Sequence, residues 1–141
     1  VELEDLHIDI ATAQLIKRPE SFDVIVTTNL FGDILSDEAA QIVGGLGIAA
    51  GANIGDRYGM FEPVHGSAPK YTGQNKVNPI ATIEAVRMML EYLGEKKAAD
   101  RVGKATLKVL EEGKVLTYDL GGTAKTSDMG KAIAEKVLQL N

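Results

Sequence analysis

Two aspartates spaced four residues apart are the first feature of this sequence that could do chemistry. Asp33 and Asp37 follow a short apolar run, and this spacing places both carboxylates on one face of a helix. Like charges so placed repel each other unless a cation, a proton or solvent intervenes. A hard divalent cation, which prefers oxygen ligands, is one interpretation. The other is an acidic first helical turn, which the helix dipole and capping favour. Taken alone, the two residues favour the second interpretation.

Composition excludes several classes of function. The 141 residues carry a formal net charge of -5, which argues against broad nucleic-acid binding and requires any phosphate site to be a local cluster. No apolar run approaches the roughly 20 residues of a membrane span, and no leader pattern is visible. The absence of cysteine excludes disulfides and thiol chemistry and fits a reducing compartment. We expect a globular, cytoplasmic protein with no nucleic-acid or membrane partner.

The first 45 residues contain the elements that must position the aspartates. Residues 5–18 have helical periodicity through Leu6, Ile10 and Ala13, and Pro19 ends that helix. Residues 23–28 form a continuous β-branched run that predicts a buried strand. A strand followed by the helix of Asp33 is a βα unit, and active sites of such sheets gather where strands end and helices begin.

A glycine-rich segment, residues 44–55, follows that helix. Residues 45–50 match the G-x-G-x-x-A form of the dinucleotide fingerprint, but the fingerprint must follow a strand and open a helix, so we reject it. The glycines instead favour a change of chain direction. Residues 60–73 predict a long functional loop whose Gly66-Ser67-Ala68 backbone is open to an anion.

Three helices are predicted in the remaining sequence. The first begins at Asn78-Pro79 with a stripe of Ile83, Val86, Leu90 and Leu93, and the second covers residues 95–112 and stops at Gly113. A strand is expected at residues 115–118 and a turn at residues 119–122. The last helix is capped by Thr126 or Ser127, and its stripe is Met129, Ile133, Val137 and Leu140. The sequence shows no Walker loop and no nucleophile set of the Ser/His/Asp or Cys/His kind.

Two stretches carry a resemblance to a known family: Asn29-Leu30-Phe31-Gly32-Asp33-Ile34-Leu35-Ser36-Asp37 and Phe61-Glu62-Pro63-Val64-His65-Gly66-Ser67-Ala68-Pro69. Together they resemble the isocitrate and isopropylmalate dehydrogenases, which are metal-dependent β-decarboxylating enzymes. The resemblance implies the C-terminal portion of that non-Rossmann, three-layer α/β fold. Residues 1–45 would be part of the small, dimer-forming domain, and residues 46–141 would be the C-terminal half of the large nucleotide-binding domain.

The resemblance also implies a metal site. Asp33 and Asp37 match the metal-binding carboxylates of the family, and Asp9 matches a third that each subunit of a homodimer supplies to its partner's active site. Magnesium or manganese, as hard cations, suit such ligands. The ion would polarise the oxygen at the carbon being oxidised and stabilise the enolate left by carbon dioxide.

The loop and the residues after it resemble the nucleotide site of the family. By that resemblance Glu62 lies near the nicotinamide ribose, His65 packs at the adenosine, and the backbone of Gly66, Ser67 and Ala68 approaches the phosphates. Asn78 would read the adenine, and Val77 beside it would be a further cofactor-binding residue. Taken alone, His65 is more simply a loop histidine with a local hydrogen-bond partner.

Lys70-Tyr71 points to the choice of cofactor. NAD-using members of the family commonly have an aspartate where Lys70 stands, whereas a lysine followed by tyrosine offers charge-assisted hydrogen bonds to a 2′-phosphate. Tyr118 matches a further tyrosine of the NADP pattern, but the expected arginine is replaced by the turn Gly121-Gly122. The resemblance therefore favours NADP, with NAD as the alternative.

The implied reaction is the oxidation of isocitrate to 2-oxoglutarate, a step of the tricarboxylic acid cycle. Two alternatives stay open: 3-isopropylmalate or homoisocitrate as the small-molecule substrate, and a non-catalytic regulatory subunit. The acid–base lysine and tyrosine of the family are expected upstream of residue 1, so no catalytic residue is assigned in this chain. By itself the chain is expected to be inactive.

Overall fold

The computed structural model describes residues 2–140, which form two compact units that divide between Gly45 and Leu46. The division falls in the glycine-rich segment, where Gly44 and Gly45 have φ angles of 120° and 108°. Such angles are accessible to glycine and strained for other residues, which explains why the helix ends there. The assignment of the two units to a dimer-forming and a nucleotide-binding domain stays a prediction.

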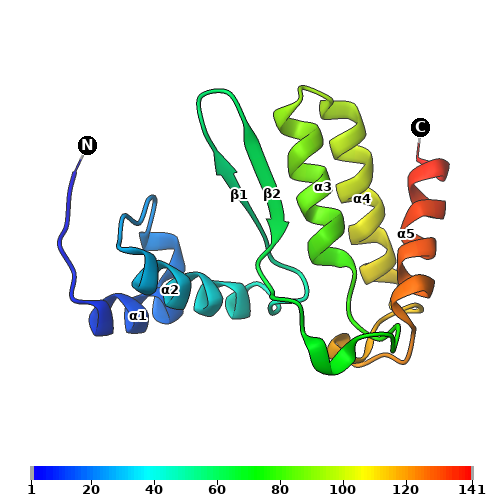
Figure 1. The fold of residues 1–141 in the computed structure, drawn as a ribbon, viewed down its shortest axis with the longest axis horizontal. Helices are drawn as coiled ribbons and strands as arrows, with labels where there is room; N and C mark the ends of the chain where they lie inside the picture. The colour runs from blue at the N-terminus through cyan, green and yellow to red at the C-terminus, as the bar shows by residue number, and fades with distance from the viewer. Residues whose placement is uncertain (1, 141) are drawn as a thin grey trace. The chain divides into compact units, whose positions relative to one another are not determined.

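The first unit contains two helices, α1 (Ile8–Lys17) and α2 (Asn29–Ile42), with a short 3-10 turn, η1 (Pro19–Ser21), after α1 (Figure 1). The helices contact each other. Ala11 and Leu15 are the buried residues of α1, and Leu35 and Ala40 are those of α2. The spacing of four places the two buried residues of α1 on one face, whereas those of α2 are five apart, about 140° around the helix, and border a wider face.

The predicted apolar stripe of the first helix is wrong. Ile10 is 45% exposed and Ala13 is exposed as well, whereas Ala11 and Leu15 are buried. The helix is apolar on more than one face, and within its unit only α2 covers it. The face that α2 covers is therefore the one that is buried, and periodicity alone could not choose between the faces.

The predicted strand at residues 23–28 is also absent. The segment has no strand partner among residues 2–140, and Val24 and Val26 are 78% and 90% exposed. A strand is stable only when a neighbour pairs with its backbone groups, and β-branched composition cannot supply that neighbour. The run leads directly into α2, which begins at Asn29 with no intervening loop.

The second unit begins with an antiparallel hairpin that the sequence did not reveal. Strand β1 (Ala50–Ile54) pairs with β2 (Gly59–Pro63), and Gly51 lies opposite Glu62. The expected loop at residues 60–73 is thus a strand over its first four residues. An isolated hairpin is marginal in water. Helix α3 (Ile80–Tyr92) supports it, because Tyr92 meets the ring of Phe61 with centroids 5.5 Å apart.

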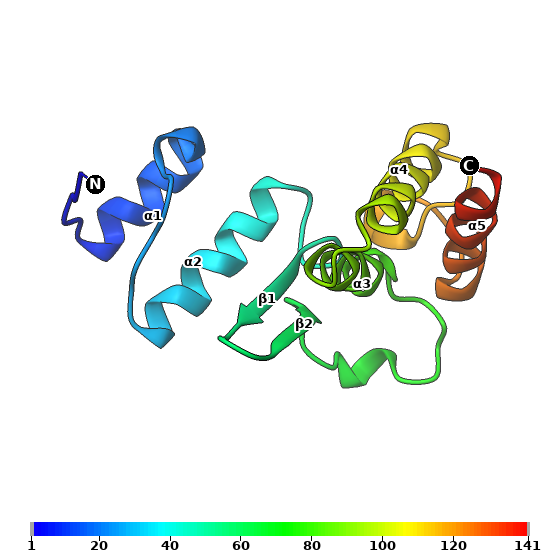
Figure 2. The same ribbon diagram turned by 90° about the horizontal axis from the view of Figure 1, so that it is seen from above.

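Three helices form the body of this unit. Helix α4 (Lys96–Glu112) contacts both α3 and α5 (Thr126–Gln139), and Figures 1 and 2 show the three side by side. The predicted end of α4 is confirmed: Gly113 is left-handed, with a φ of 64°. The core is made by Ile80, Ala105, Val109, Met129 and Ile133. No helix within residues 2–140 has both the length and the apolar character needed to cross a bilayer.

The predicted stripes of α3 and α5 had different outcomes. In α5, Met129 and Ile133 are buried, and Val137 and Leu140 pack against the same core, as predicted. In α3 the buried residues are Ile80, Ala81 and Ala85, while Val86 and Leu93, which were predicted to be buried, are 43% and 63% exposed. Small alanines face α4 and the hairpin, and the larger side chains lie outside that contact.

The segment between α4 and α5 is a turn and not the predicted strand at residues 115–118. The backbone folds back on itself: Ala124 N–H donates to the Leu116 carbonyl and Gly122 N–H to the Thr117 carbonyl. Residues Tyr118–Leu120 form the 3-10 turn η3, and Gly121 takes a φ of 79°, as the predicted turn requires. The predicted cap of α5 is wrong, because the Asp128 carboxylate accepts from Lys125 N–H instead.

Candidate functional site

The three aspartates of the expected metal site lie in the first unit. Asp33 and Asp37 are exposed and lie one turn apart on α2, and Asp9 is exposed near the start of α1. Within residues 2–140 no three acidic or histidine side chains come together as a metal cluster. Asp33 and Asp37 therefore offer oxygen ligands of the kind that magnesium and manganese take, but a complete site needs ligands from outside this chain.

The loop after β2 leaves backbone donors open. In the described chain the N–H groups of Gly66, Ser67 and Ala68 have no protein acceptor. Ala68 is left-handed, with φ 43° and ψ 59°, a strained conformation for a residue with a Cβ. It precedes the 3-10 turn η2 (Pro69–Tyr71). Successive free N–H groups in such a turn suit an anion, as the sequence predicted.

His65 is half-buried at the start of this loop. Its Nδ1 lies 2.9 Å from the carbonyl oxygen of Gly66. Because a carbonyl only accepts, this contact places the proton on Nδ1 and leaves Nε2 as an acceptor. The histidine is thus held by its own loop, as its simpler interpretation expects, and one ring nitrogen stays available to a ligand.

Two tyrosines and two lysines come together from the turn η2, the turn η3 and the segment that precedes α3. The rings of Tyr71 and Tyr118 have centroids 5.9 Å apart and are tilted by 42°. The ammonium nitrogen of Lys70 lies 4.9 Å from the Tyr71 centroid, and that of Lys76 lies 4.6 Å from the Tyr118 centroid. We call these four residues the lysine–tyrosine cluster. A cation held over a ring face is favourable.

The two phenols of this cluster differ in acidity. The hydroxyl of Tyr118 and then the ammonium of Lys70 lower the pKa of Tyr71. The Tyr71 hydroxyl raises the pKa of Tyr118 in turn. A lower pKa makes Tyr71 the better hydrogen-bond donor to an anion. The cluster as a whole therefore presents positive charge and an acidic hydroxyl in a chain of net charge -5.

Asn78 is a buried polar side chain near the cluster, with 5% of its surface exposed. Its Oδ1 accepts from Ile80 N–H at 2.9 Å, which caps α3 as predicted, and its Nδ2 donates to the Asp119 carboxylate at 2.9 Å. One N–H of the amide and one lone pair of its oxygen are thus occupied. A contact from the side chain to adenine would use the second N–H or the second lone pair.

The other predicted cofactor residues lie on either side of the loop. Glu62 is exposed on β2, 3.5 Å from the side-chain nitrogen of Asn53. Val77 is half-buried, and its carbonyl accepts from the hydroxyl of Thr126. The structure therefore brings Lys70, Tyr71 and Tyr118 together and leaves Glu62 separate from them along the strand.

Sequence analysis missed three residues of this region. Lys76 belongs to the cluster, Asp119 holds Asn78, and Asn75 binds the start of α5 through Ser127 N–H at 3.0 Å. The position of Lys76 two residues before Asn78 is the signal that could have identified it. The partners of Asn75 and Asp119 are 52 and 41 residues away in sequence, so no local pattern pointed to them.

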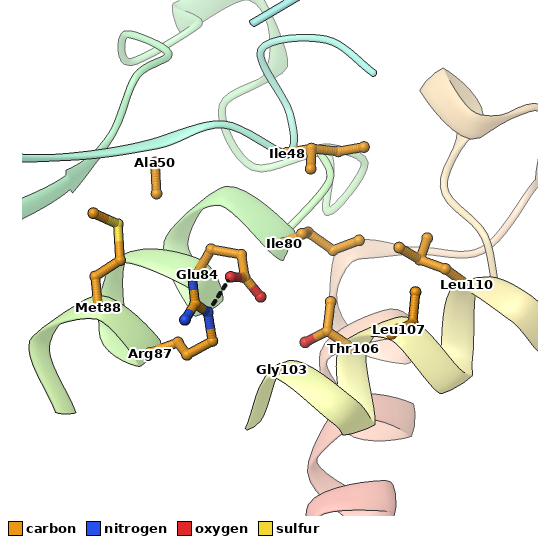
Figure 3. A pocket seen from close by; sticks show the side chains of 10 residues that line it. All are labelled: Ile48, Ala50, Ile80, Glu84, Arg87, Met88, Gly103, Thr106, Leu107 and Leu110. Atoms are coloured by element: carbon orange, nitrogen blue, oxygen red, sulfur yellow. Dashed lines mark hydrogen bonds and ion pairs between the residues drawn. The ribbon is translucent and has the colours of Figure 1, made fainter. Parts of the chain in front are cut away.

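A pocket of about 280 Å³ lies elsewhere in the second unit, between α3 and α4 (Figure 3). Its lining is mostly apolar and includes Ile48, Ile80 and Leu107; its charged members are Glu84 and Arg87, which form an ion pair at 2.5 Å. The Glu84 carboxylate raises the pKa of Arg87. None of the predicted site residues lines this pocket, so it offers no support for the cofactor site.

The geometry thus defines a protein whose second unit has a loop with open backbone N–H groups and the lysine–tyrosine cluster, and whose first unit carries a pair of exposed helical carboxylates. Comparison with known proteins agrees with that class. The sequence profile of the isocitrate/isopropylmalate dehydrogenases matches residues 1–133. The chain belongs to the isocitrate/isopropylmalate dehydrogenase family, and its α/β fold is the corresponding part of the family fold. These are decarboxylating dehydrogenases that use NAD(P) and a divalent metal ion.

Individual relatives have similar identity but different substrates in their names. The chain is 55% identical to an isocitrate/homoisocitrate dehydrogenase of Thermus thermophilus over 99% of its length and 53% identical to a 3-isopropylmalate/3-methylmalate dehydrogenase of Methanocaldococcus jannaschii over 97%. The crystal structure of isocitrate dehydrogenase from Methylococcus capsulatus superposes with a TM-score of 0.90 at 48% identity, covering 97% of this chain and 41% of that one. The chain spans 42% and 41% of the two curated relatives, respectively.

Proposed function

We propose that the intact protein is a cytoplasmic, homodimeric dehydrogenase that oxidises and decarboxylates isocitrate to 2-oxoglutarate with NADP and magnesium or manganese. The observation that carries the proposal is the lysine–tyrosine cluster. Lys70 lies 4.9 Å from the ring of Tyr71, and that ring lies against Tyr118. These residues present hydrogen-bond donors and positive charge, which would stabilise a bound 2′-phosphate and would not stabilise a neutral ribose hydroxyl in the same way.

The residues of the second unit have distinct tasks in this proposal. The free N–H groups at Gly66, Ser67 and Ala68 bind the phosphates of the cofactor. His65 keeps Nε2 as an acceptor for the adenosine end, and Val77 supplies an apolar contact to the adenine. Glu62 accepts from the ribose near the nicotinamide. The amide of Asn78 fixes the start of α3 below this loop.

The metal site is proposed to form between subunits. Asp33 and Asp37 of one chain and Asp9 of its partner would hold the ion, because the described residues of one chain assemble no group of three. When bound, the ion supplies electrostatic stabilisation of the negative charge that develops on the substrate oxygen. The aspartates keep their carboxylates exposed and able to accept it.

The surface of the first unit supports a dimer. Leu30, Phe31 and Ile34 of α2 are 66%, 40% and 49% exposed, and Ile16 of α1 is 62% exposed. Helices that leave this much apolar surface uncovered in a small unit usually bury it against a partner. The helices that carry the three aspartates are therefore the ones proposed to pack against the second subunit.

The direct test uses the intact protein and both cofactors. We expect NADP-dependent release of 2-oxoglutarate from isocitrate, and a steep loss of the preference for NADP in Lys70→Asp, because the substitution replaces an attractive charge with a repulsive one. The loss is expected to be about 100-fold or more in kcat/KM, from a charge-assisted hydrogen bond of about 3 kcal/mol. Unchanged selectivity in Lys70→Asp would remove the basis of the cofactor assignment.

The substrate has a second candidate, 3-isopropylmalate or homoisocitrate, which the near-equal identity to relatives of both kinds favours. Assay of the intact protein with each acid decides between them.

The regulatory-subunit alternative is tested by manganese titration. We expect the intact protein to bind manganese at least 10-fold more tightly than its Asp33→Asn variant, because a charged ligand is lost. Equal manganese affinity of the two proteins would favour the regulatory-subunit alternative.

A further inference from the structure

Lys76 lies over both aromatic rings of the lysine–tyrosine cluster. Its ammonium nitrogen is 4.6 Å from the centroid of Tyr118 and 5.7 Å from that of Tyr71. Because the two rings are 5.9 Å apart, the ammonium group is close to both ring faces at once. Cation–π attraction favours this placement of the side chain.

The backbone on each side of Lys76 is tied to the start of α5. Asn75 receives two hydrogen bonds there, to its carbonyl from Thr126 N–H and to its Oδ1 from Ser127 N–H, each at 3.0 Å. It also donates from Nδ2 to the Ser127 hydroxyl at 2.8 Å. The Val77 carbonyl accepts from the Thr126 hydroxyl. The backbone at Lys76 is therefore held in place by its neighbours, and its ammonium group lies against the two rings. Both restraints lower the ordering cost of binding.

The positive charge of the cluster is not neutralised locally. No carboxylate of the described chain lies within ion-pair distance of Lys70 or Lys76. The nearest acid along the chain to Tyr118 is Asp119, and its two oxygens accept from the Thr117 hydroxyl and the Asn78 amide. Two ammonium groups that face the same tyrosine repel each other, and a doubly charged anion would relieve that repulsion.

The turn after Tyr118 contributes no further cation. Gly121 and Gly122 form it, and a Cβ added at Gly122 would lie 2.0 Å from the Leu116 carbonyl oxygen. No side chain fits at that position without moving the backbone. This turn therefore offers no charged side chain to an anion held by Lys70, whereas Lys76 lies over the rings of Tyr71 and Tyr118.

We propose that Lys76 is a specificity-determining residue that binds the 2′-phosphate of NADP together with Lys70. The inference rests on the proposed use of NADP and goes beyond it by assigning a residue to the selectivity. Lys76 would supply the second positive charge for the dianion, and the aromatic rings would hold its ammonium group before the nucleotide arrives.

The test compares Lys76→Gln with the unmodified intact protein, using two probes. Adenosine 2′,5′-bisphosphate and 5′-AMP differ by the 2′-phosphate alone, and calorimetry gives their dissociation constants. We expect Lys76→Gln to raise the dissociation constant of the bisphosphate by about 10- to 100-fold, which corresponds to the loss of a charge-assisted hydrogen bond. The dissociation constant of 5′-AMP should change by less than about twofold. The KM for NADP should rise in parallel, while that for NAD stays unchanged.

Two further variants sharpen the comparison. Lys76→Arg keeps the charge and should retain most of the discrimination. Lys104→Gln removes an exposed lysine of α4 that has no ion-pair partner in the described chain, and it should change neither dissociation constant. Circular dichroism of each variant verifies that the fold is intact.

The possible failures are distinguishable. If Lys70→Asp abolishes the preference for the bisphosphate but Lys76→Gln does not alter it, NADP use stands and the role of Lys76 is refuted. An equal loss of affinity for both probes in Lys76→Gln would also refute it, because the lysine would then not distinguish the nucleotide that carries a 2′-phosphate. If the unmodified protein binds both probes equally, the proposed use of NADP and the inference fall together.

Discussion

Removing the side chain of Asn78 should loosen the start of α3 by an amount that the structure allows us to estimate. The amide caps the helix through Ile80 N–H, and such a cap contributes about 1 kcal/mol. It also donates to the Asp119 carboxylate, and because Asp119 is exposed we take the lower value for a bond to a charged group, about 1.5 kcal/mol. Asn78→Ala should therefore cost about 2.5 kcal/mol, or about 70-fold in the local opening equilibrium.

Hydrogen exchange of the intact protein measures this opening locally. The informative amides are Ala81 N–H, which donates to the Gly47 carbonyl at 3.0 Å, and Ile83 N–H, which donates to the Pro79 carbonyl at 3.1 Å. Both should exchange about 70-fold faster in Asn78→Ala, since their exchange requires the first turn of α3 to open. Asn78→Ser retains the cap and loses only the bond to Asp119. Its free energy of opening should therefore be about 1.5 kcal/mol lower than that of the unmodified protein.

A matched control is available in the hairpin. Asn53 is exposed, and its side chain meets Glu62 only at 3.5 Å. Asn53→Ala should therefore change the free energy of opening that these exchange rates report by less than about 0.5 kcal/mol. If Asn78→Ala altered the exchange of Ala81 and Ile83 by less than about threefold, the two hydrogen bonds would contribute little. Our account of how α3 is positioned would then be wrong.

Two other predictions concern α5 and its surroundings. Gly122→Ala should lower the stability of the intact protein by about 3 kcal/mol through overpacking against Leu116, whereas Gly130→Ala, which meets nothing within 4 Å in α5, should raise it by up to about 1 kcal/mol; melting temperatures that shift in the same direction would contradict this. The Lys136 ammonium lowers the pKa of Glu112 below its ordinary value of 4.5, so the stabilisation by this pair is present above that pH and is lost as the pH falls through the lowered pKa. Lys136→Met should weaken that acid dependence in unfolding measurements, because Lys136 is the main cause of the lowered pKa, and an unaltered pH profile would contradict it.

The ends of the C-terminal helices could be predicted because the signals are local. Asn78 and Pro79 begin α3 and Gly113 ends α4, through conformations and hydrogen bonds that involve only nearby residues. The open backbone of the loop could also be predicted, since the small residues Gly66, Ser67 and Ala68 leave their N–H groups without acceptors in the described chain. The recognition of the family depended on the same kind of short, contiguous pattern.

Strands were predicted poorly because a strand depends on its neighbour. The β-branched run at residues 23–28 pairs with nothing in the described chain, whereas the plain sequence of Ala50–Ile54 forms a ladder with Gly59–Pro63. Composition measures only the fitness of a residue for a pleated surface. Pairing is decided by which second segment the fold brings alongside.

The sequence by itself determined the family, the aspartate pair of α2 and the basic and aromatic character of the segment at Lys70 and Tyr71, because each depends on residue type and short spacing. Only the tertiary structure decided that Lys76 joins Tyr71 and Tyr118 and that Asp119 holds Asn78. These contacts join residues up to 42 positions apart, and their energies depend on distance in space. A lysine that is unremarkable in the sequence therefore becomes part of a charged site only after the turns η2 and η3 have been packed together.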